Sequence, residues 1–543
     1  MRVPSIAVIV GLACLPALAG PAQHEHASGA PAVARVGNVH FATSCLPAVG
    51  TDFDHAVALL HSFWFSAAID AFGHVLQKDP SCAMAHWGIA MSWWGNPFGG
   101  SRSPTALREG AAAAEKGRAA RARTDRERGY IAAVALLYRD AATVGERTRT
   151  VAYEQAMGRL AAAQPADPEA RIFYALALDQ TALPTDKTYA NQLKAAGILE
   201  REFARQPDHP GIAHYLIHSY DTPALAPRAL AAARHYATIA PDAPHALHMP
   251  SHTFTRLGYW QESIDANLAS AAAARKEDNG ASEELHAMDY ATYAYLQTAQ
   301  DAAARRIVDA LGPIAARIQA NAAGVAAPAT AGHFAVAAIP ARYALERGDW
   351  AAAAALQPTE AGPPWIRAVT FFARALGSAR LGRADDAARD LDTLVSLGET
   401  LKKTNDTYWA GQVDIERRVA AAWIAFARGR RDEAIAAMRE AAGMEDATDK
   451  SAISPGPLKP ARELLGEMLL EADRPADALA EFDKTMQKEP NRFRGIYGAA
   501  RAAERAGDRT RARTLYARLL TICERAETPP RAELVEARTV AGR

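Results

Sequence analysis

Apolar residues recur at helical spacing along the chain, in pairs of short segments separated by a polar turn. Near the C-terminus, "ARELLGEMLLEADRPADALAEFDKTMQKEP" carries Gly466 in a first segment and Phe482 in a second. A shift of 34 residues places Ala500 at the position of Gly466 and Tyr516 at the position of Phe482. Small residues allow two helices to approach closely, and the aromatic side chain fills the gap to the next pair. The pattern therefore predicts a repeated pair of antiparallel helices.

This spacing is that of the tetratricopeptide (TPR) repeat, and it recurs along most of the chain. In "FDHAVALLHSFWFSAAIDAFGHVLQKDP", Ala68, Phe72 and Pro80 stand at the corresponding offsets. "ALERGDWAAAAAL", "ARLGRADDAARDL" and "FARGRRDEAIAAM" each join a helix end to an Ala-rich helix through a short Gly-containing turn. No strand-like alternation is long enough to predict a sheet. The expected fold is all-α, a TPR-like α-solenoid: a superhelix of about ten to thirteen antiparallel helical pairs.

Composition divides such a chain into segments rather than separate domains. "ANAAGVAAPATAG" (320–332) has low complexity, which is typical of a loop between repeats. "AAGMEDATDKSAISPGPLKPARE" (441–463) is a polar, proline-rich insertion ahead of the regular C-terminal repeats. The expected segments are a signal peptide (1–19), a flexible lead (20–40), an N-terminal TPR-like segment with a histidine-rich centre (41–320), a low-complexity loop (321–340) and a C-terminal TPR segment (341–543).

The first residues, "MRVPSIAVIVGLACLPALAG", have the layout of a Sec-type signal peptide. A short positive region at Arg2 precedes an apolar stretch, and Ala17-Leu18-Ala19 forms an A-x-A site, so cleavage is expected near Ala19. A lipobox at Cys14 is the competing interpretation, and it fits the residues before it poorly. The layout looks bacterial, and a periplasmic or secreted location is expected. No later stretch has about 18 uninterrupted apolar residues, so no membrane span is expected.

Export makes a disulfide permissible, and three cysteines remain after cleavage. Cys45 and Cys82 flank the first helical pair and are the natural partners. Closing a loop of that size stabilises the fold by roughly 4 kcal/mol in the chain-entropy model. Cys523 has no evident partner and is expected to pack as a small apolar residue.

The balance of charges excludes one class of partner. The chain has 61 basic and 61 acidic residues, for a formal net charge of zero. A protein that binds nucleic acid through its phosphates needs a basic surface, so nucleic acid is not an expected partner.

Histidines are concentrated in one part of the chain. All 16 lie at or before His333, and six fall within the 39 residues from His214 to His252, five of them in "HYLIHSYD" and "PHALHMPSH". Interchangeable repeats give no reason for this asymmetry. The N-terminal half therefore carries an additional feature.

The TPR register predicts where these histidines point. His214 and His218 take positions 5 and 9 of a first helix, and His252 takes position 2 of the next, so all three should line one concave groove. His248 is expected in the connecting loop, just outside the helix that begins with Pro250. Histidines at i and i+4 lie on one helix face about 6 Å apart, which suits metal binding. The four histidines are the predicted ligands of one transition metal ion, with zinc first and copper or iron as alternatives.

Two other interpretations remain open for the same residues. The groove could be polar and metal-free, binding a peptide or an anionic ligand, or the histidines could be structural. Further residues are possible outer-sphere groups or ligand contacts, although core packing or loop capping explains several of them equally well. They are Asp221, His245, His286, Asp289, Trp87, Tyr174, Lys187 and Tyr189.

No catalytic signature of a known enzyme class is present: HExxH, GxSxG, P-loop, GxGxxG and CxxC are all missing. The leading hypothesis is an exported TPR-repeat protein that binds a protein, a peptide or a small ligand in its groove, with a possible histidine metal site. The alternative is a metal-dependent hydrolase or oxidase; the sequence leaves open whether the protein is an enzyme. A scaffold needs an open groove, whereas an enzyme needs the long loops 320–332 and 441–460 to close over the histidines.

Six stretches together resemble a family of exported bacterial TPR-repeat proteins of uncharacterised function. They are "LLHSFWF", "DPSCAMAHWGIAM", "HPGIAHYLIHSYDTP", "PHALHMPSHTFTRLG", "IPARYALERGDW" and "PGPLKPARELLGEMLLE". The resemblance extends from about Asn38 to the C-terminus. It implies the fold, an N-terminal signal and a histidine-rich central segment, and it transfers no catalytic residues.

Overall fold

The computed structural model describes residues 1, 33–100, 102–320 and 324–542. The predicted signal peptide and most of the predicted lead therefore lie outside the described residues. By its contacts the chain forms two units, Met1–Ala34 and Arg35–Arg543, and everything below concerns the second.

Every regular element in the described residues is helical. The N-terminal helices are η1 (Pro47–Val49), α1 (Gly50–His61), α2 (Phe65–Lys78), α3 (Ala83–Trp94), α4 (Pro104–Ala119), α5 (Asp125–Tyr138), α6 (Glu146–Ala163), α7 (Pro168–Thr181) and α8 (Ala190–Phe203). The central helices are α9 (Pro210–Ser219), α10 (Ala226–Ile239), α11 (Pro244–His248), α12 (Pro250–Leu257), α13 (Trp260–Ala274), α14 (Ala281–Gln297), α15 (Asp301–Ala315) and α16 (Ala329–Arg347). The C-terminal helices are α17 (Trp350–Ala354), α18 (Pro364–Arg380), α19 (Ala384–Lys403), α20 (Thr407–Ala427), α21 (Arg431–Asp446), α22 (Ala461–Glu471), α23 (Pro475–Lys488), α24 (Phe493–Arg505), α25 (Arg509–Ile522) and α26 (Ala532–Ala541).

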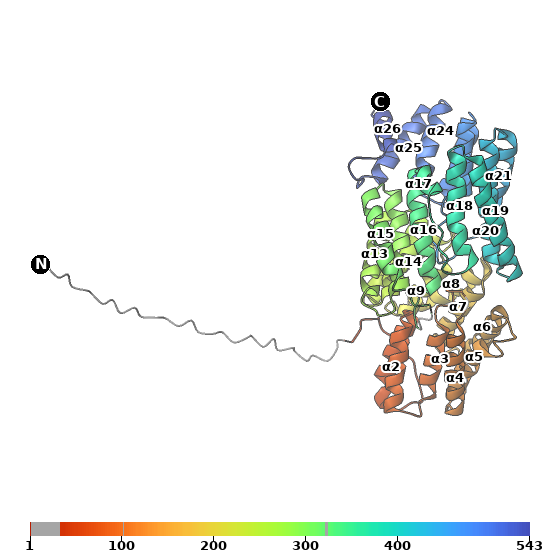
Figure 1. Cartoon of the computed structure of the whole chain (residues 1–543). Coiled ribbons are helices and arrows are strands. Elements are labelled where there is room, and N and C mark those ends of the chain that lie inside the picture. The colour runs from red at the N-terminus through yellow and green to blue at the C-terminus, as the bar shows by residue number, and fades with distance from the viewer. Residues whose placement is uncertain (2–32, 101, 321–323, 543) are drawn as a thin grey trace. The chain divides into compact units, whose positions relative to one another are not determined.

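Consecutive helices pack as hairpins against their neighbours, from α1 and α2 to α25 and α26 (Figure 1). The contact between glycine and aromatic ring that the repeat pattern predicts is present at both ends of the solenoid. Phe72 of α2 packs on Gly88 of α3, and Phe482 of α23 packs on both Gly466 and Gly498. The all-α, TPR-like α-solenoid is confirmed.

Cys45 and Cys82 form a disulfide, as predicted, and it ties the segment before η1 to the start of α3. Cys523 is a free thiol and is buried, with its Sγ near the carbonyl oxygen of Gln297. Its expected role as a small packing residue is confirmed.

Both expected loops are shorter than predicted. The low-complexity loop was placed at 321–340, but α16 begins at Ala329, so residues 329–340 are helical. Ala is the strongest helix former, and its repetition here outweighs the low complexity that suggested a loop. The second insertion, expected at 441–463, is also shorter: α21 ends at Asp446 and α22 begins at Ala461, which leaves residues 447–460, named here the 447–460 loop.

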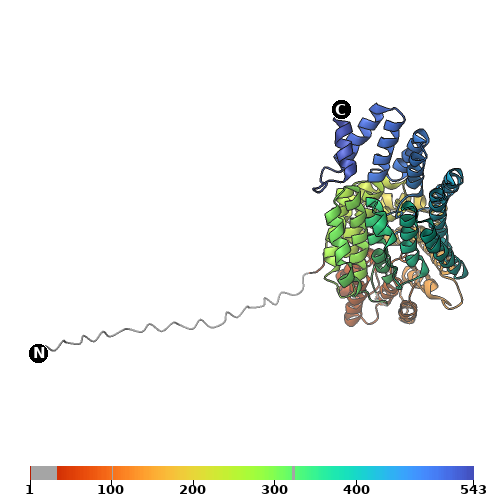
Figure 2. The ribbon, with the colours of Figure 1, turned by 45° about the horizontal axis from the view of Figure 1, so that its top comes forward.

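The C-terminal repeats also contact the central ones, which a linear solenoid does not require. In Figures 1 and 2, α24–α26 lie at the upper ends of α13–α15. The indole Nε1 of Trp260 donates to the carbonyl oxygen of Asn491 at 2.8 Å, and Asn491 donates to that of Gly258. Arg492 is fully buried and pairs with Glu346 and Glu463. These contacts fix the centre of the chain against its end.

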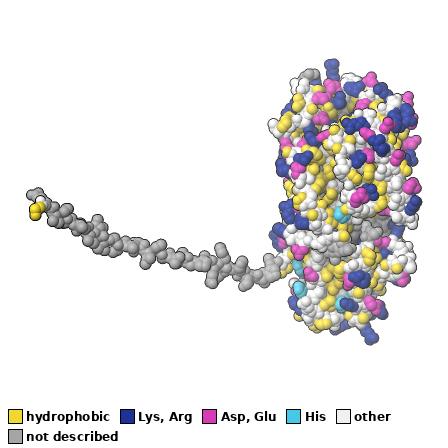
Figure 3. Space-filling view, in the orientation of Figure 1, with side chains coloured by type: hydrophobic (Ala, Val, Ile, Leu, Met, Phe, Trp, Pro, Cys, Tyr) yellow, Lys and Arg dark blue, Asp and Glu magenta, His cyan; other side chains and the backbone are white. Residues whose placement is uncertain are grey.

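The visible surface carries charges of both signs, interspersed over most of its elements (Figure 3). No basic field of the kind that binds phosphates stands out on this face. Among the described residues, no helix combines the length and the apolar character needed to cross a bilayer.

Two identical substitutions should change stability in opposite directions. In Gly498→Ala, the new Cβ would lie 2.3 Å from the ring of Phe482, and we expect a loss of about 1–3 kcal/mol of unfolding free energy. In Gly411→Ala, at an exposed position of α20, the Cβ meets nothing within 4 Å, so better helix propensity should add about 0.5–1 kcal/mol. Urea denaturation measures both, and equal effects would contradict the packing role of Gly498.

Candidate metal centre

Six histidines from four helices converge at the centre of the chain. α9 supplies His214 and His218, α11 supplies His245 and His248, α12 supplies His252, and α14 supplies His286. They form two groups, in each of which one ligating atom per residue lies within 4.8 Å of the others. We name His214, His218 and His245 the first triad, and His248, His252 and His286 the second triad.

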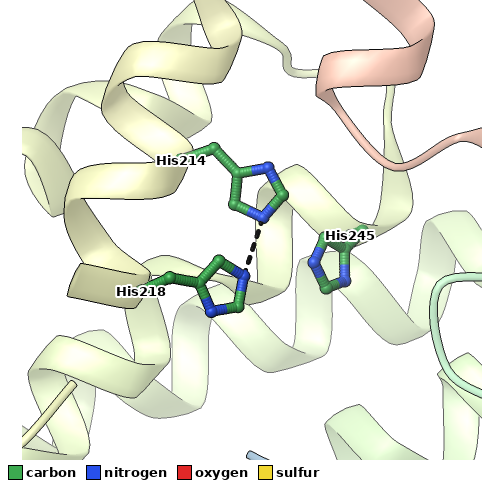
Figure 4. A group of neighbouring side chains, drawn as sticks. All are labelled: His214, His218 and His245. Carbon is green, nitrogen blue, oxygen red and sulfur yellow. Dashed lines mark hydrogen bonds between the residues drawn. The ribbon is translucent and has the colours of Figure 1, made fainter. Parts of the chain in front are cut away.

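The first triad joins one turn of α9 to the start of α11 (Figure 4). The Nε2 atoms of His214 and His218 lie 3.2 Å apart. The Nδ1 of His214 donates to the carbonyl oxygen of His61 at 2.8 Å, so its Nε2 carries the lone pair. His245 is 7% exposed, and its Nε2 has no hydrogen-bond partner in the described residues.

The second triad has the more constrained geometry. The Nε2 atoms of His248 and His252 face each other at 3.0 Å. The Nδ1 of His248 donates to Asn267 Oδ1 at 2.7 Å, and the Nδ1 of His252 donates to Asp221 Oδ2 at 2.8 Å. Asn267 is oriented by its own amide, which donates to the carbonyl oxygen of Ser263. Because both Nδ1 atoms carry the ring proton, two neutral imidazoles here direct lone pairs at each other.

His286 completes the second triad from α14. Its ring centre lies 4.5 Å from that of His248, and its Nδ1 is buried without a hydrogen-bond partner in the described part of the chain. A buried imidazole nitrogen without a partner is costly unless something binds it.

Burial keeps these imidazoles neutral. Desolvation lowers the pKa of His214 and of His286 to about 3, with smaller contributions from neighbouring histidines. Desolvation also lowers the pKa of His218, His245 and His248 far below the ordinary value. Neutral imidazole is the form that binds metal ions, so the site holds its histidines ready for that role.

Asp221 orients the second triad and collects its counter-charges. Besides accepting from His252, its carboxylate accepts from Arg256 Nε at 2.9 Å and from Lys450 Nζ at 3.2 Å. Lys450 also reaches the hydroxyl of Tyr290, at 3.3 Å. Burial lowers the pKa of Lys450 to about 8, although Asp221 opposes this shift. A carboxylate behind a ligating histidine is the usual outer-sphere arrangement of metal sites.

Three loops cover the histidines. A cavity of about 20 Å³ is lined by His218 and His245 of the first triad and by His252 and His286 of the second. Its other walls come from residues 96–99, from residues 326–328 and from Ala452 and Ile453 of the 447–460 loop. This volume holds about one water molecule. Among the described residues, these loops therefore leave only a small space beside the histidines.

The 447–460 loop is anchored along its whole length. Arg342, itself paired with Asp289 at 2.8 Å, donates to Ser454 and to the carbonyl oxygens of Gly456 and Pro457. Tyr290 donates to the carbonyl oxygen of Ala452. At the start of the loop, Lys187 pairs with Asp449 at 2.8 Å.

The structure brings together all four predicted ligands but divides them between the two triads, with His245 and His286 as third members. His248 was expected in a loop, but it is the last residue of helix α11. Residues 244–248 are helical because nothing before Pro250 breaks the helix; Pro250 lacks an N–H and begins α12. Asp289 was considered an outer-sphere group of the histidines; it pairs with Arg342 and anchors the loop.

Trp87 was considered for the groove, and the structure contradicts this. Its ring packs against Phe41, Tyr130 and Phe173 in the core of the N-terminal helices. Tyr174 accepts from Lys194 and packs on Gly158, away from the histidine cavity. Tyr189 has a left-handed backbone conformation and precedes α8. Its pKa is raised mainly by burial and secondly by the negative charge of Asp449 in the 447–460 loop.

Sequence reasoning missed several residues of the site. His248 and His252 were predicted as ligands, but not as a second pair at i and i+4, although this spacing is visible in "HMPSH". Asn267 and Lys450 gave no signal of their own. A further buried cluster was also missed: Glu169 accepts from His61 Nε2 at 2.9 Å and from His209 Nε2 at 2.8 Å. His61 in turn presents its carbonyl oxygen to His214.

No protein-family model matches the chain, and no curated protein matches it. Among solved structures, the chain is similar to the TPR domain of P58(IPK), with 14% identity, 68% of this chain and 98% of that chain covered, and a TM-score of 0.21. It is also similar to yeast Tom70, with 11% identity, 91% of this chain and 94% of that chain covered, and a TM-score of 0.29. A third similar structure is the human IFIT1 dimer with m7Gppp-AAAA, with 11% identity, 81% of this chain and 90% of that chain covered, and a TM-score of 0.34. At these identities and TM-scores the similarity carries no functional inference.

Asp221→Asn should destabilise the metal-free protein. The substitution leaves Arg256 and Lys450 buried beside a neutral group, and we expect a loss of about 3–5 kcal/mol of unfolding free energy. Asp242→Asn is the matched control, because Asp242 pairs at the surface with the exposed Arg35 and should cost less than about 1 kcal/mol. Urea denaturation in EDTA measures both variants. Similar losses would refute the central role of Asp221.

Proposed function

We propose that the protein binds a transition metal ion through His248, His252 and His286, with zinc as the first choice and copper or iron as alternatives. The carrying observation is the 3.0 Å approach of two Nε2 atoms whose rings both use Nδ1 as donor. A proton between them would create a cation that burial disfavours. Two nitrogens that bind one tetrahedral zinc ion at about 2.05 Å lie about 3.3 Å apart, close to the distance found here.

The closed setting favours a metal-dependent enzyme over an open-groove scaffold. Three protein ligands leave a fourth position open, which is typical of catalytic rather than structural zinc. The covering loops leave a cavity of about 20 Å³ beside the histidines, and Lys450 and Tyr290 stand beside the triad as hydrogen-bonding groups. The reaction class that fits is metal-assisted hydrolysis or hydration, in which zinc lowers the pKa of its bound water to about 7.

An extracytoplasmic location is part of this proposal. The N-terminal apolar stretch with its A-x-A site supports export. The Cys45–Cys82 disulfide supports it independently, because disulfides persist mainly in oxidising compartments.

A metal analysis tests the proposed function. The mature protein, purified without a histidine tag, is made metal-free, incubated with one metal at a time and measured by ICP-MS. We expect His252→Ala to hold one equivalent of zinc fewer than the wild type. His235→Ala, at a partly exposed histidine outside both triads, should hold as much as the wild type. A wild type that retains no zinc, copper or iron would refute the proposal.

A second pocket favours ligand binding by the solenoid itself. Its lining includes Trp365, Trp409, Glu416 and Glu445, together with Lys450 of the 447–460 loop. The two indoles are stacked, with ring centres 3.9 Å apart. Neither glutamate has an ion pair in the described residues, and burial raises the pKa of Glu416 to about 8, with a further contribution from Glu445. We propose that this pocket, named here the tryptophan pocket, takes a small organic ligand that stacks on the two indoles.

The glutamate in this pocket predicts a pH-dependent stability difference. Between pH 4.5 and 8 the unfolded chain releases the Glu416 proton and the folded chain keeps it, so stability falls as the pH rises. Glu416→Gln lacks this loss. The variant should therefore match the wild type near pH 4 and become more stable than it by pH 8–9. Thermal melts across this range measure the difference, with exposed Glu440→Gln as control. A difference independent of pH would contradict the raised pKa.

A further inference from the structure

We infer that the site holds two metal ions, the second bound by His214, His218 and His245, with one water-sized oxygen ligand between them. The inference deepens the proposed function and rests on it. Both triads line the same small cavity, so two ions bound by them would lie on either side of it.

The first triad has its own lone pairs to satisfy. The Nδ1–H of His214 is committed to the carbonyl oxygen of His61, so the His214 Nε2 is an acceptor that faces His218 at 3.2 Å. That separation is again close to the spacing of about 3.3 Å between two nitrogens on tetrahedral zinc. His245 adds a buried Nε2 without a partner in the described residues. A single ion in the second triad leaves these groups unexplained.

One ion cannot serve all six imidazoles. Ligating nitrogens lie 2.0–2.1 Å from zinc, so those of one ion must cluster tightly, and only the members of each triad do so. The triads are nevertheless adjacent: ring centres are 6.2 Å apart for His218 and His252, and 6.1 Å apart for His245 and His248. Ions in neighbouring three-nitrogen sites are suited to share a ligand, as in two-metal sites generally.

The cavity lies where such a shared ligand belongs. Two of its histidines come from the first triad and two from the second, and its volume is about 20 Å³. Since this is the size of one water molecule, the ligand class is a single oxygen donor, such as water or hydroxide. A bridging hydroxide also offsets the repulsion between two dications in a buried site. Each triad also has outer-sphere groups that orient its imidazoles. His61 accepts from the first triad, and Asp221 and Asn267 accept from the second.

Metal stoichiometry separates two ions from one. Metal-free full-length protein is titrated with zinc sulfate by calorimetry, and the bound zinc is counted by ICP-MS after gel filtration. The variants are His245→Gln in the first triad and His286→Gln in the second, because each removes an imidazole nitrogen that has no hydrogen-bond partner. The wild type should bind two equivalents and each single variant one. The double variant should bind none, and circular dichroism confirms that every variant is folded.

The remaining outcomes overturn the inference in distinguishable ways. One equivalent in the wild type, retained by His245→Gln and lost by His286→Gln, would leave the proposed function standing and refute the second ion. Two equivalents in the wild type that persist in His245→Gln would refute this ligand set. No zinc in the wild type would remove the proposed function as well. Cobalt substitution gives an independent count, because each three-nitrogen site should add its own visible absorption band.

Discussion

The carboxylate of Asp221 is the interaction on which the centre of this molecule depends. It receives His252 from α12, Arg256 from the next turn of the same helix, and Lys450 from a loop that lies 229 residues away in sequence. Each of these groups is buried, and none could remain so at acceptable cost without an acceptor of opposite charge. The same carboxylate fixes the tautomer of His252, which directs its Nε2 toward His248. Charge balance and ligand geometry are thus set by one side chain.

A solenoid provides this arrangement because its repeats are stacked at fixed intervals. Successive first helices bring α9, α12 and α14 side by side, and α11 is the short addition that inserts His245 and His248 between them. The cost is considerable. Six imidazoles without charge and several buried nitrogens without partners oppose folding, and the surrounding alanine-rich core contributes the burial that offsets them. Structural histidines would be expected to complete their hydrogen bonds; His245 and His286 do not.

The architecture was predictable because it depends on the spacing of residues that are close together in the sequence. The 34-residue period and the pairing of small residues with aromatic ones, as in Gly466 with Phe482, are readable without knowledge of distant contacts. The same register placed His214, His218 and His252 together. Partners that come from elsewhere were not readable: the pairing of Asp289 with Arg342 and that of Lys450 with Asp221 depend on where the 447–460 loop docks. Trp87 was ambiguous for a related reason, since a helical stripe does not show which face meets the core. The start of α16 was misjudged because alanine repetition is both low in complexity and strongly helical.

The distance in sequence between the histidines and the 447–460 loop has a consequence for the order of events during folding. Repeat proteins usually fold through contacts between neighbours, whereas this loop reaches back by more than 150 residues to Tyr290 and further to Asp221. All six imidazoles come from adjacent repeats, so they can assemble before the 447–460 loop docks over them. Metal ions would bind while the histidines are still exposed to solvent, and the 447–460 loop would cover them when it docks. Retention of the ions would then be a kinetic property. It would depend on how rarely the loop loses its contacts with Arg342 and the contact between its own Lys450 and Asp221, and not on affinity alone.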